Sequence, residues 1–146
     1  MNRRQSKLAE QKPYIVRQAN EFGKLIPTKR DGKRQFRNLV SVAATVDCVE
    51  ELRLFILYKA HKEGTRSYWE TVNTSKEAQR LIQKFTYGKT NVSLAEVLSD
   101  KLLHLKSIAD RIEQDSQEVY LEVVRLFLGY LYWNVCILTD EQRGNA

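Results

Sequence analysis

Apolar residues recur at helical spacing along most of the chain. Within residues 36–46 the apolar side chains stand three or four positions apart: Phe36, Leu39, Ala43 and Val46. This spacing predicts a helix with one buried face. We expect it within residues 31–62, as one kinked helix or as two short ones, because Asp47 and Glu50 form a capping pattern in the middle of the segment. Residues 52–60 are apolar on nearly all sides except Lys59, which predicts a central position in the core.

The first segment also has an amphipathic pattern, over residues 6–22, but Pro13 interrupts it. Proline is tolerated in the first turn of a helix and disfavoured in its interior. We therefore expect the first helix to begin at Pro13 and to stop at Gly23. Residues 1–12 would then form a basic N-terminal arm.

Two capping-box patterns mark later helix starts. Thr74 with Glu77 predicts a short helix that ends near Phe85, and Ser93 with Glu96 predicts another that carries one apolar stripe through Ile112. A strongly apolar helix is expected over residues 116–138, followed by a frayed polar tail over residues 139–146. With only two prolines and six glycines in 146 residues, the chain reads as a single all-α domain, a bundle of five to six helices.

The net charge of +6 is concentrated in the first quarter of the chain. Residues 1–37 hold eleven Lys and Arg against three Asp and Glu, a charge of +8, whereas the remainder holds thirteen against fifteen, a charge of −2. Such asymmetry favours a polyanionic partner, although a solubilising arm would have the same composition.

The run PTKRDGKRQFRNL, residues 27–39, holds the densest group of cations. On an ideal helix Arg30, Lys33, Arg34 and Arg37 fall within an arc of about 100°, opposite the apolar face. Clustered cations repel one another and oppose the dipole at a helix N-terminus, so stability alone does not explain them. We predict that this stripe binds a phosphate backbone. The residues assigned to it are Lys29, Arg30, Lys33, Arg34 and Arg37, with Lys24, Lys62 and Arg66 as second-rank candidates.

Catalytic and metal-binding patterns are poorly represented. His61 and His104 have no partner at ligand spacing, and Cys48 and Cys136 match no metal motif and suggest free thiols. The paired acids Glu118–Glu122 and Asp110–Glu113 are read as solvated positions, and GKT at residues 88–90 lacks the upstream glycine of a P-loop. We expect no enzyme activity, no metal site and no cofactor.

The remaining features concern the surroundings of the basic run. Tyr68 and Trp69, beside Arg66, suit either base stacking or a loop anchor, and the anchor is favoured. No base-reading module is recognisable, so binding is expected to be to the backbone, with little sequence preference.

The N-terminus lacks a secretory signal, and the most apolar run, residues 126–138, is too short to span a bilayer, so a cytoplasmic location is expected.

Three stretches resemble the small, all-helical subunit of CRISPR RNA-guided effector complexes of the type III and type I-D kind. LIPTKRDGKRQFRNLVSVAATV (25–46) resembles that family's basic and then amphipathic helix, and VEELRLFILYKAHKEG (49–64) resembles the core helix that follows it. EVYLEVVRLFLGYLYW (118–133) is similar to the terminal helix, with its acidic start and aromatic end. Two features depart from the type III members, namely His61 in the place of an arginine and the long aromatic loop 63–74.

The resemblance implies a non-catalytic subunit. Copies of it would stack head-to-tail along the subunits that hold the guide RNA, next to the large subunit of the complex. Basic side chains would hold the target or displaced DNA or RNA strand and stabilise the R-loop, while base pairing would read the sequence. No membrane is implied.

Three other functions fit the same residues. A stand-alone helical RNA-binding accessory protein would carry the same basic stripe. An adaptor would use the stripe to meet an acidic protein partner and would bind nucleic acid weakly. A metal-dependent or nucleotide-hydrolysing bundle enzyme would require acids that converge from several helices.

Overall fold

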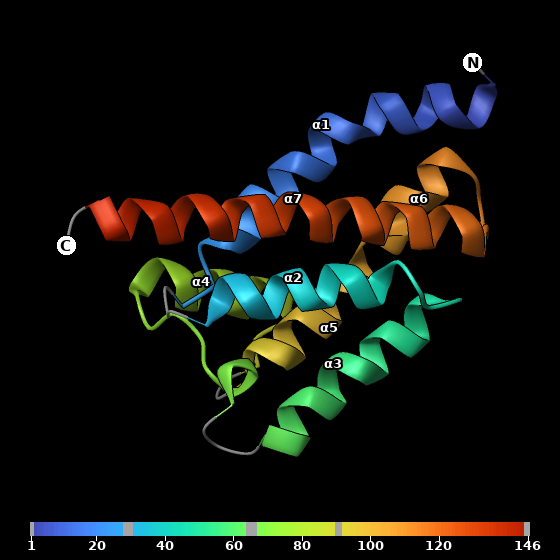
Figure 1. Ribbon diagram of the computed structural model, residues 1–146. Helices are drawn as coiled ribbons and strands as arrows, with labels where there is room; N and C mark the ends of the chain where they lie inside the picture. The colour runs from blue at the N-terminus through green and yellow to red at the C-terminus, as the bar shows by residue number, and fades with distance from the viewer. Residues whose placement is uncertain (1, 28–30, 64–66, 90–91, 145–146) are drawn as a thin grey trace.

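The chain folds into an all-α bundle. The computed structural model describes residues 2–27, 31–63, 67–89 and 92–144, with the backbone alone for residue 63 and residues 140–144, and this part of the chain contains no strand (Figure 1). The elements are α1 (Arg3–Gly23), α2 (Gly32–Ala43), α3 (Val49–Glu63), the 3-10 turn η2 (Tyr68–Glu70), α4 (Lys76–Phe85), α5 (Leu94–His104), α6 (Lys106–Ile112) and α7 (Gln117–Gly144). Only Leu105 separates α5 from α6, so the predicted single helix over this stretch is one broken helix; with this pair counted once, the described residues form six helices.

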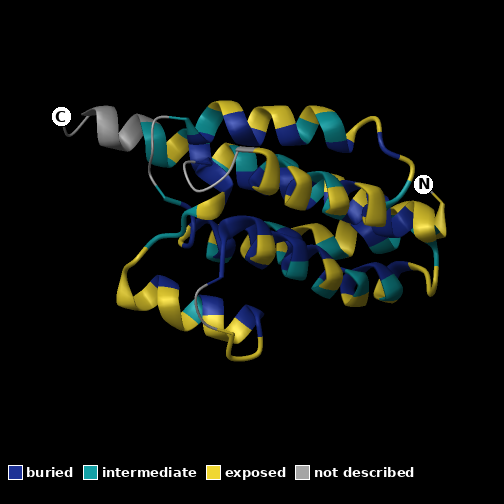
Figure 2. Ribbon diagram, turned by 90° about the horizontal axis from the view of Figure 1, so that it is seen from below, coloured by how far each residue is buried: buried dark blue, intermediate teal, exposed yellow. Residues whose placement is uncertain are grey.

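Helix α7 is the centre of the bundle. It packs mainly against α1, α2 and α6, while α5 packs against α3, α4 and η2. Figure 2 shows the buried positions turned inward along the helices and the exposed positions on their outer sides. Phe22 of α1 joins the two groups, because its ring lies 6.0 Å from that of Phe127 on α7 and 6.0 Å from that of Phe85 on α4. Burial of such aromatic side chains supplies much of the driving force for folding.

The predicted start of the first helix is wrong. Helix α1 begins at Arg3 and continues through Pro13, so residues 3–12 are helical and do not form an arm. A capping box explains the early start: Asn2 Oδ1 accepts from the Gln5 backbone N–H, and the Gln5 side chain accepts from that of Asn2. Proline costs one backbone hydrogen bond in a helix interior and typically bends it, and α1 bends between its two halves in Figure 1.

The last helix extends beyond its predicted end. Residues 139–144, expected as part of a frayed tail, continue α7 to Gly144. The Thr139 hydroxyl donates to the Val135 carbonyl (2.8 Å) and does not interrupt the helix. The Glu, Gln and Arg residues that follow have high helix propensity.

The segment predicted as one or two helices resolves into two, α2 and α3. The C-terminus of α2 is held by Arg125 of α7. The Arg125 guanidinium donates to the carbonyl of Ala43 (2.7 Å) and to that of Val46 (3.1 Å). These carbonyls lie at the negative end of the helix dipole, where a cation is stabilising.

We expect Arg125→Ala to lower the free energy of unfolding by about 1–2 kcal/mol, because the carbonyls at the end of α2 lose a charged donor. Denaturant unfolding followed by circular dichroism measures the change. Arg80→Ala is a matched control, because Arg80 is exposed in the middle of α4, away from either end of that helix, and it should cost less. Equal effects of the two substitutions would contradict the capping role.

Capping predictions for α4 and α5 are largely confirmed. Ser93 and Glu96 form the predicted box at α5, with Val92 and Val97 both buried beside it. At α4 the cap is Ser75 and not Thr74, since the Ser75 hydroxyl accepts from the Ala78 backbone N–H (3.1 Å).

Two strongly apolar helices each expose an apolar face, although residues 52–60 of the first were expected to be central to the core. On α3, Leu54 is 68% exposed and Tyr58 is 52% exposed, and on α7, Trp133 is 63% exposed. Both helices have apolar residues around most of their circumference, and the neighbouring helices cover only part of it. The structure therefore leaves apolar surface on α3 and on the C-terminal half of α7.

By length and composition alone, residues Gln117–Thr139 of α7 pass the test for a membrane span, with a mean hydropathy of 1.4. A core helix of a water-soluble protein passes the same test, and α1, α2 and α6 all pack on α7.

Candidate nucleic-acid interface

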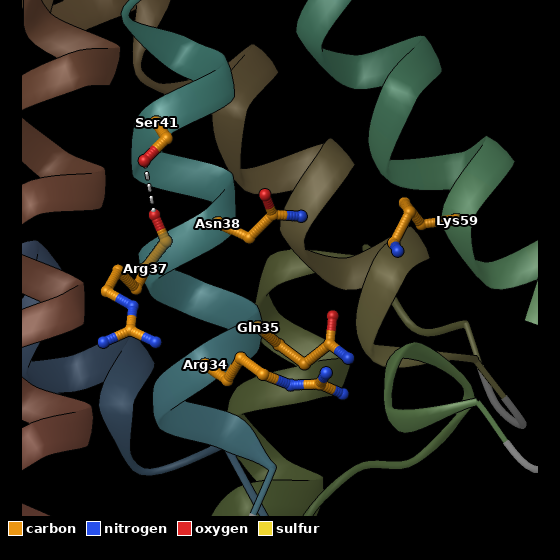
Figure 3. A pocket seen from close by; sticks show the side chains of 6 residues that line it. All are labelled: Arg34, Gln35, Arg37, Asn38, Ser41 and Lys59. Atoms are coloured by element: carbon orange, nitrogen blue, oxygen red, sulfur yellow. Dashed lines mark hydrogen bonds between the residues drawn. The ribbon is translucent and has the colours of Figure 1, made fainter.

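A polar hollow of about 480 Å³ lies between α2 and α3 (Figure 3). Arg34, Gln35, Arg37, Asn38 and Ser41 of α2 line it together with Lys59 of α3. Among the described residues, its lining contains three cations, two amides and a hydroxyl, and no carboxylate. The three cations and the Asn38 amide are groups that can donate hydrogen bonds to an anion, which makes the hollow suited to phosphate oxygens.

Helix geometry brings these side chains together. Asn38 follows Arg34 by one turn, and Ser41 follows Arg37 by one turn, so the four residues form two short rows on α2. The Ser41 hydroxyl is held by a bond to the Arg37 carbonyl (3.2 Å). Figure 3 shows Arg34 and Asn38 on the α3 side of α2, with Arg37 extending to the other side. A strand seated here would contact cations on both edges of α2.

Asp31 organises the first turn of α2. Its carboxylate accepts from Arg34 Nε (2.8 Å) and from Gln35 Nε2 (2.7 Å). The Arg34 hydrogen bond is the largest influence that holds the pKa of Asp31 below its ordinary value, so the carboxylate stays charged. The pair orients Arg34 and cancels part of its charge. Lys33, Arg34, Arg37 and Lys59 against Asp31 leave this region net positive.

Trp69 and Tyr68 pack against the residues of α2. Trp69 is 2% exposed and its Nε1–H donates to Gln35 Oε1 (3.1 Å), so Gln35 is fixed from both ends. Tyr68 packs so closely on Gly32 that a Cβ at this glycine would lie 2.8 Å from the Tyr68 hydroxyl oxygen. The ring of Phe36 lies 5.2 Å from that of Trp69. The two aromatic residues are therefore a loop anchor, as favoured from the sequence, and are buried away from any base.

Of the eight predicted contact residues, Arg34 and Arg37 line the hollow. Lys33 is half-buried on the same helix and is not part of the lining. Lys24 is paired with Glu77 of α4 (3.1 Å), and Lys62 lies over the ring of Tyr58 on α3, so neither joins the hollow. The other three predictions, Lys29, Arg30 and Arg66, lie outside the described residues.

Four lining residues were missed by sequence reasoning: Gln35, Asn38, Ser41 and Lys59. The spacing of Asn38 and Ser41, one turn after Arg34 and Arg37, was a signal that a search for cations alone overlooked. Lys59 was visible as the polar exception in an apolar helix. The position of Lys59 beside α2 could not be predicted from the sequence, because the packing of the two helices sets the angle between them.

A second basic cluster lies on α1 and α6. The ring of Tyr14 is flanked by two guanidinium groups, with Arg111 at 5.3 Å and Arg17 at 5.9 Å from its centroid. Arg4 nearby is neutralised by Glu113 and Glu118. Two carboxylates thus pair with one arginine of this cluster, whereas the residues that line the hollow at α2 include none among the described residues, and Asp31 pairs with Arg34 beside it.

The acidic and histidine side chains bear on the alternative of a metal-dependent enzyme. No group of three or more His, Cys, Asp or Glu that could hold a metal ion occurs there. Glu118 is occupied by Arg4, and Asp110 by Lys106 (3.3 Å). His104 is half-buried against the ring of Tyr87, and burial is the main cause that lowers its pKa.

No family model matches the chain, and neither a curated protein nor a solved structure is detectably similar.

Proposed function

We propose that this protein is a non-catalytic subunit that holds a single nucleic-acid strand by its phosphate backbone. The observation that carries the proposal is the hollow between α2 and α3, which Arg34, Arg37 and Lys59 line together with three uncharged polar side chains. Multiple phosphate contacts from such groups give affinity without sequence preference.

The resemblance to CRISPR small subunits suggests the complex in which this strand binding would occur. In a type III or type I-D effector, the hollow would hold the target or displaced strand while the guide RNA reads the sequence. The backbone subunits around the guide RNA and the large subunit would be its partners, and the complex would be cytoplasmic. Co-expression with the guide RNA and these subunits tests the setting: stable co-purification supports it, and a protein that remains alone contradicts it.

The binding test removes the three cations of the hollow together, as Arg34→Gln, Arg37→Gln and Lys59→Gln. We expect single-strand affinity at low salt to fall about 10- to 100-fold. The slope of log affinity against log salt should become shallower by about 2, because three phosphate contacts are lost. Fluorescence anisotropy with labelled single-stranded RNA and DNA measures both quantities.

The matched control removes three exposed cations elsewhere, as Lys12→Gln, Lys76→Gln and Arg80→Gln. It changes the net charge equally, so any difference between the two variants reflects the hollow and not the overall charge. Equal losses would overturn the assignment to α2 and α3. Weak binding by the unchanged protein even at low salt would favour an adaptor that meets an acidic protein.

A further inference from the structure

An aromatic surface lies on the C-terminal half of α7. Trp133 and Ile137 are 63% and 58% exposed, and Leu126 and Tyr130 are half-buried beside them. At 100° per residue the four side chains fall within an arc of about 60°. The rings of Trp133 and Tyr130 lie 5.8 Å apart, with 55° between their planes. One turn before Trp133, a Cβ added to Gly129 would contact nothing within 4 Å beyond its own neighbours in the helix, so the surface beside the indole is bare.

Arg37 lies between this aromatic surface and the polar hollow. It lines the hollow, and Figure 3 shows it on the side of α2 opposite Lys59. In Figure 1 helix α2 lies between α3 and α7, and α2 packs on α7. A hydrogen bond with Cys136 is the main cause that raises the pKa of Tyr132 on α7, and the charge of Arg37 opposes the rise, so Arg37 and Tyr132 are neighbours. A strand that leaves the hollow over Arg37 therefore meets α7 beside Trp133.

We propose that Trp133 stacks on an unpaired base of the strand whose phosphates lie in the hollow. The inference rests on the proposed strand binding and adds to it a contact of a second kind. Proteins that bind single strands combine cations along the backbone with aromatic rings on which bases stack. Their sites cover about 4–16 nucleotides, so one strand is long enough to occupy the hollow and the aromatic surface together. Stacking tolerates any sequence, because every base has a π-face.

Two other aromatic side chains of the described residues are exposed, and both suit this role less well. The ring of Tyr58 on α3 is covered by Lys62, whose ammonium lies 5.9 Å from its centroid. Tyr87 follows α4 and lies on neither α2 nor α7, and its ring packs on that of His104 at 5.3 Å. Trp133 is thus the exposed ring that lies next to the Arg37 edge of the hollow.

Stacking on Trp133 restricts the ligand to strands with unpaired bases. In a duplex each base is already paired and stacked on its neighbours, so α7 would meet only the backbone. Phosphate contacts alone do not favour the single strand, since a duplex has the higher charge density. We therefore expect tighter binding to a single strand than to a duplex of the same length, and this preference should disappear without the indole.

Substitutions at Trp133 separate stacking from charge. Trp133→Leu should weaken binding of a labelled oligothymidylate of about 15 nucleotides by about 5- to 50-fold, the effect of one lost base stack. The slope of log affinity against log salt should stay the same, because no phosphate contact is lost. Trp133→Tyr keeps an aromatic face and should stay within about threefold of the unchanged protein. Fluorescence anisotropy across a salt series measures both quantities.

The matched control is Tyr87→Leu, which removes an aromatic side chain that is 85% exposed outside α2 and α7, and it should leave the affinity unchanged. An affinity of Trp133→Leu equal to that of the unchanged protein would overturn the stacking, and is the result expected if a protein partner covers this face instead. Equal losses in Trp133→Leu and Trp133→Tyr would overturn it too, because the contact would then not depend on an aromatic face.

Tryptophan fluorescence reports the contact directly, because the chain has two tryptophans and Trp69 is buried. An unlabelled oligothymidylate should quench the emission of the unchanged protein, and it should not quench Trp133→Phe, in which Trp69 alone emits. An abasic strand of the same length keeps the phosphates and should bind without quenching. Equal quenching by the abasic strand would overturn the stacking.

The stacking and the strand-binding proposal fail in different ways. Binding by anisotropy without quenching at saturating oligothymidylate overturns the stacking and leaves the hollow as the binding site. Absence of binding at low salt overturns the proposed function, and the stacking with it. The three-glutamine variant of the hollow should require more strand to reach the same quenching, because it weakens binding and keeps Trp133.

Discussion

Replacing Trp69 with alanine is expected to lower the free energy of unfolding by about 3–5 kcal/mol, more than any other single substitution proposed for this protein. Trp69 is 2% exposed and packs on Phe36 and Tyr68. Its removal leaves a cavity beneath α2 and also leaves Gln35 Oε1 without its indole donor. Urea unfolding followed by circular dichroism measures the loss, because the far-ultraviolet signal of an all-α protein does not depend on the tryptophan itself.

Trp69→Phe separates the two causes. Phenylalanine keeps most of the ring volume and removes the N–H, so the cost should fall to about 1–2 kcal/mol, the range for one unsatisfied buried acceptor. Trp133→Phe is the control at the chain's other tryptophan, which is 63% exposed, and should be nearly neutral. A Trp69→Ala variant as stable as Trp133→Phe would contradict the anchor.

Substitution of Trp69 should also affect the position of Arg34 in the hollow. Trp69 fixes Gln35, and Gln35 shares the Asp31 carboxylate with Arg34. Loss of the anchor should therefore loosen Arg34 while Lys59, on another helix, stays in place. In the proposed function, Trp69→Phe should weaken single-strand binding by a few-fold only, and the three-glutamine variant should weaken it far more.

The elements that local rules govern were predictable from the sequence. The capping box at Ser93 and the apolar stripe of α2 are decided by residues within one or two turns, so reading the chain alone was sufficient. Pro13 was misread because the rule that proline begins a helix was applied without weighing the stronger cap at Asn2. Local signals conflicted there, and the earlier cap determined the start.

The site depended on packing and was only half predictable. Arg34 and Arg37 were recognised because cations at a helix start conflict with the dipole. Lys59 was not, because only the packing of α3 beside α2 brings it to the same hollow. The exposed sides of α3 were missed for the same reason: an all-round apolar sequence predicts burial, and the number of neighbours decides how much of it is covered.

Lys101 should make stability rise with pH. It is 4% exposed on α5, where its ammonium donates to Gln18 Oε1 and lies 4.6 Å from the centroid of the Phe85 ring. Burial is the largest cause that lowers the pKa of Lys101, to about 8 from 10.5, with Glu21 opposing and Lys84 adding to the shift. The unfolded chain therefore binds more protons between these two values, and the cost of burying the charge is present in full below about pH 8 and relieved as pH rises toward 10.5.

Lys101→Met isolates this contribution, because methionine keeps the length and apolar stem of lysine without the charge. At pH 7 we expect the variant to be more stable than the unchanged protein by up to about 3 kcal/mol, less the lost contacts with Gln18 and Phe85. The advantage should shrink as pH rises through about 8 to about 10. Tyr120, whose pKa burial raises to about 12, destabilises the fold at still higher pH in both proteins, so it cancels in the difference. A difference in unfolding free energy that stays constant from about pH 7 to about pH 10 would show that Lys101 is not the group whose charge the fold opposes.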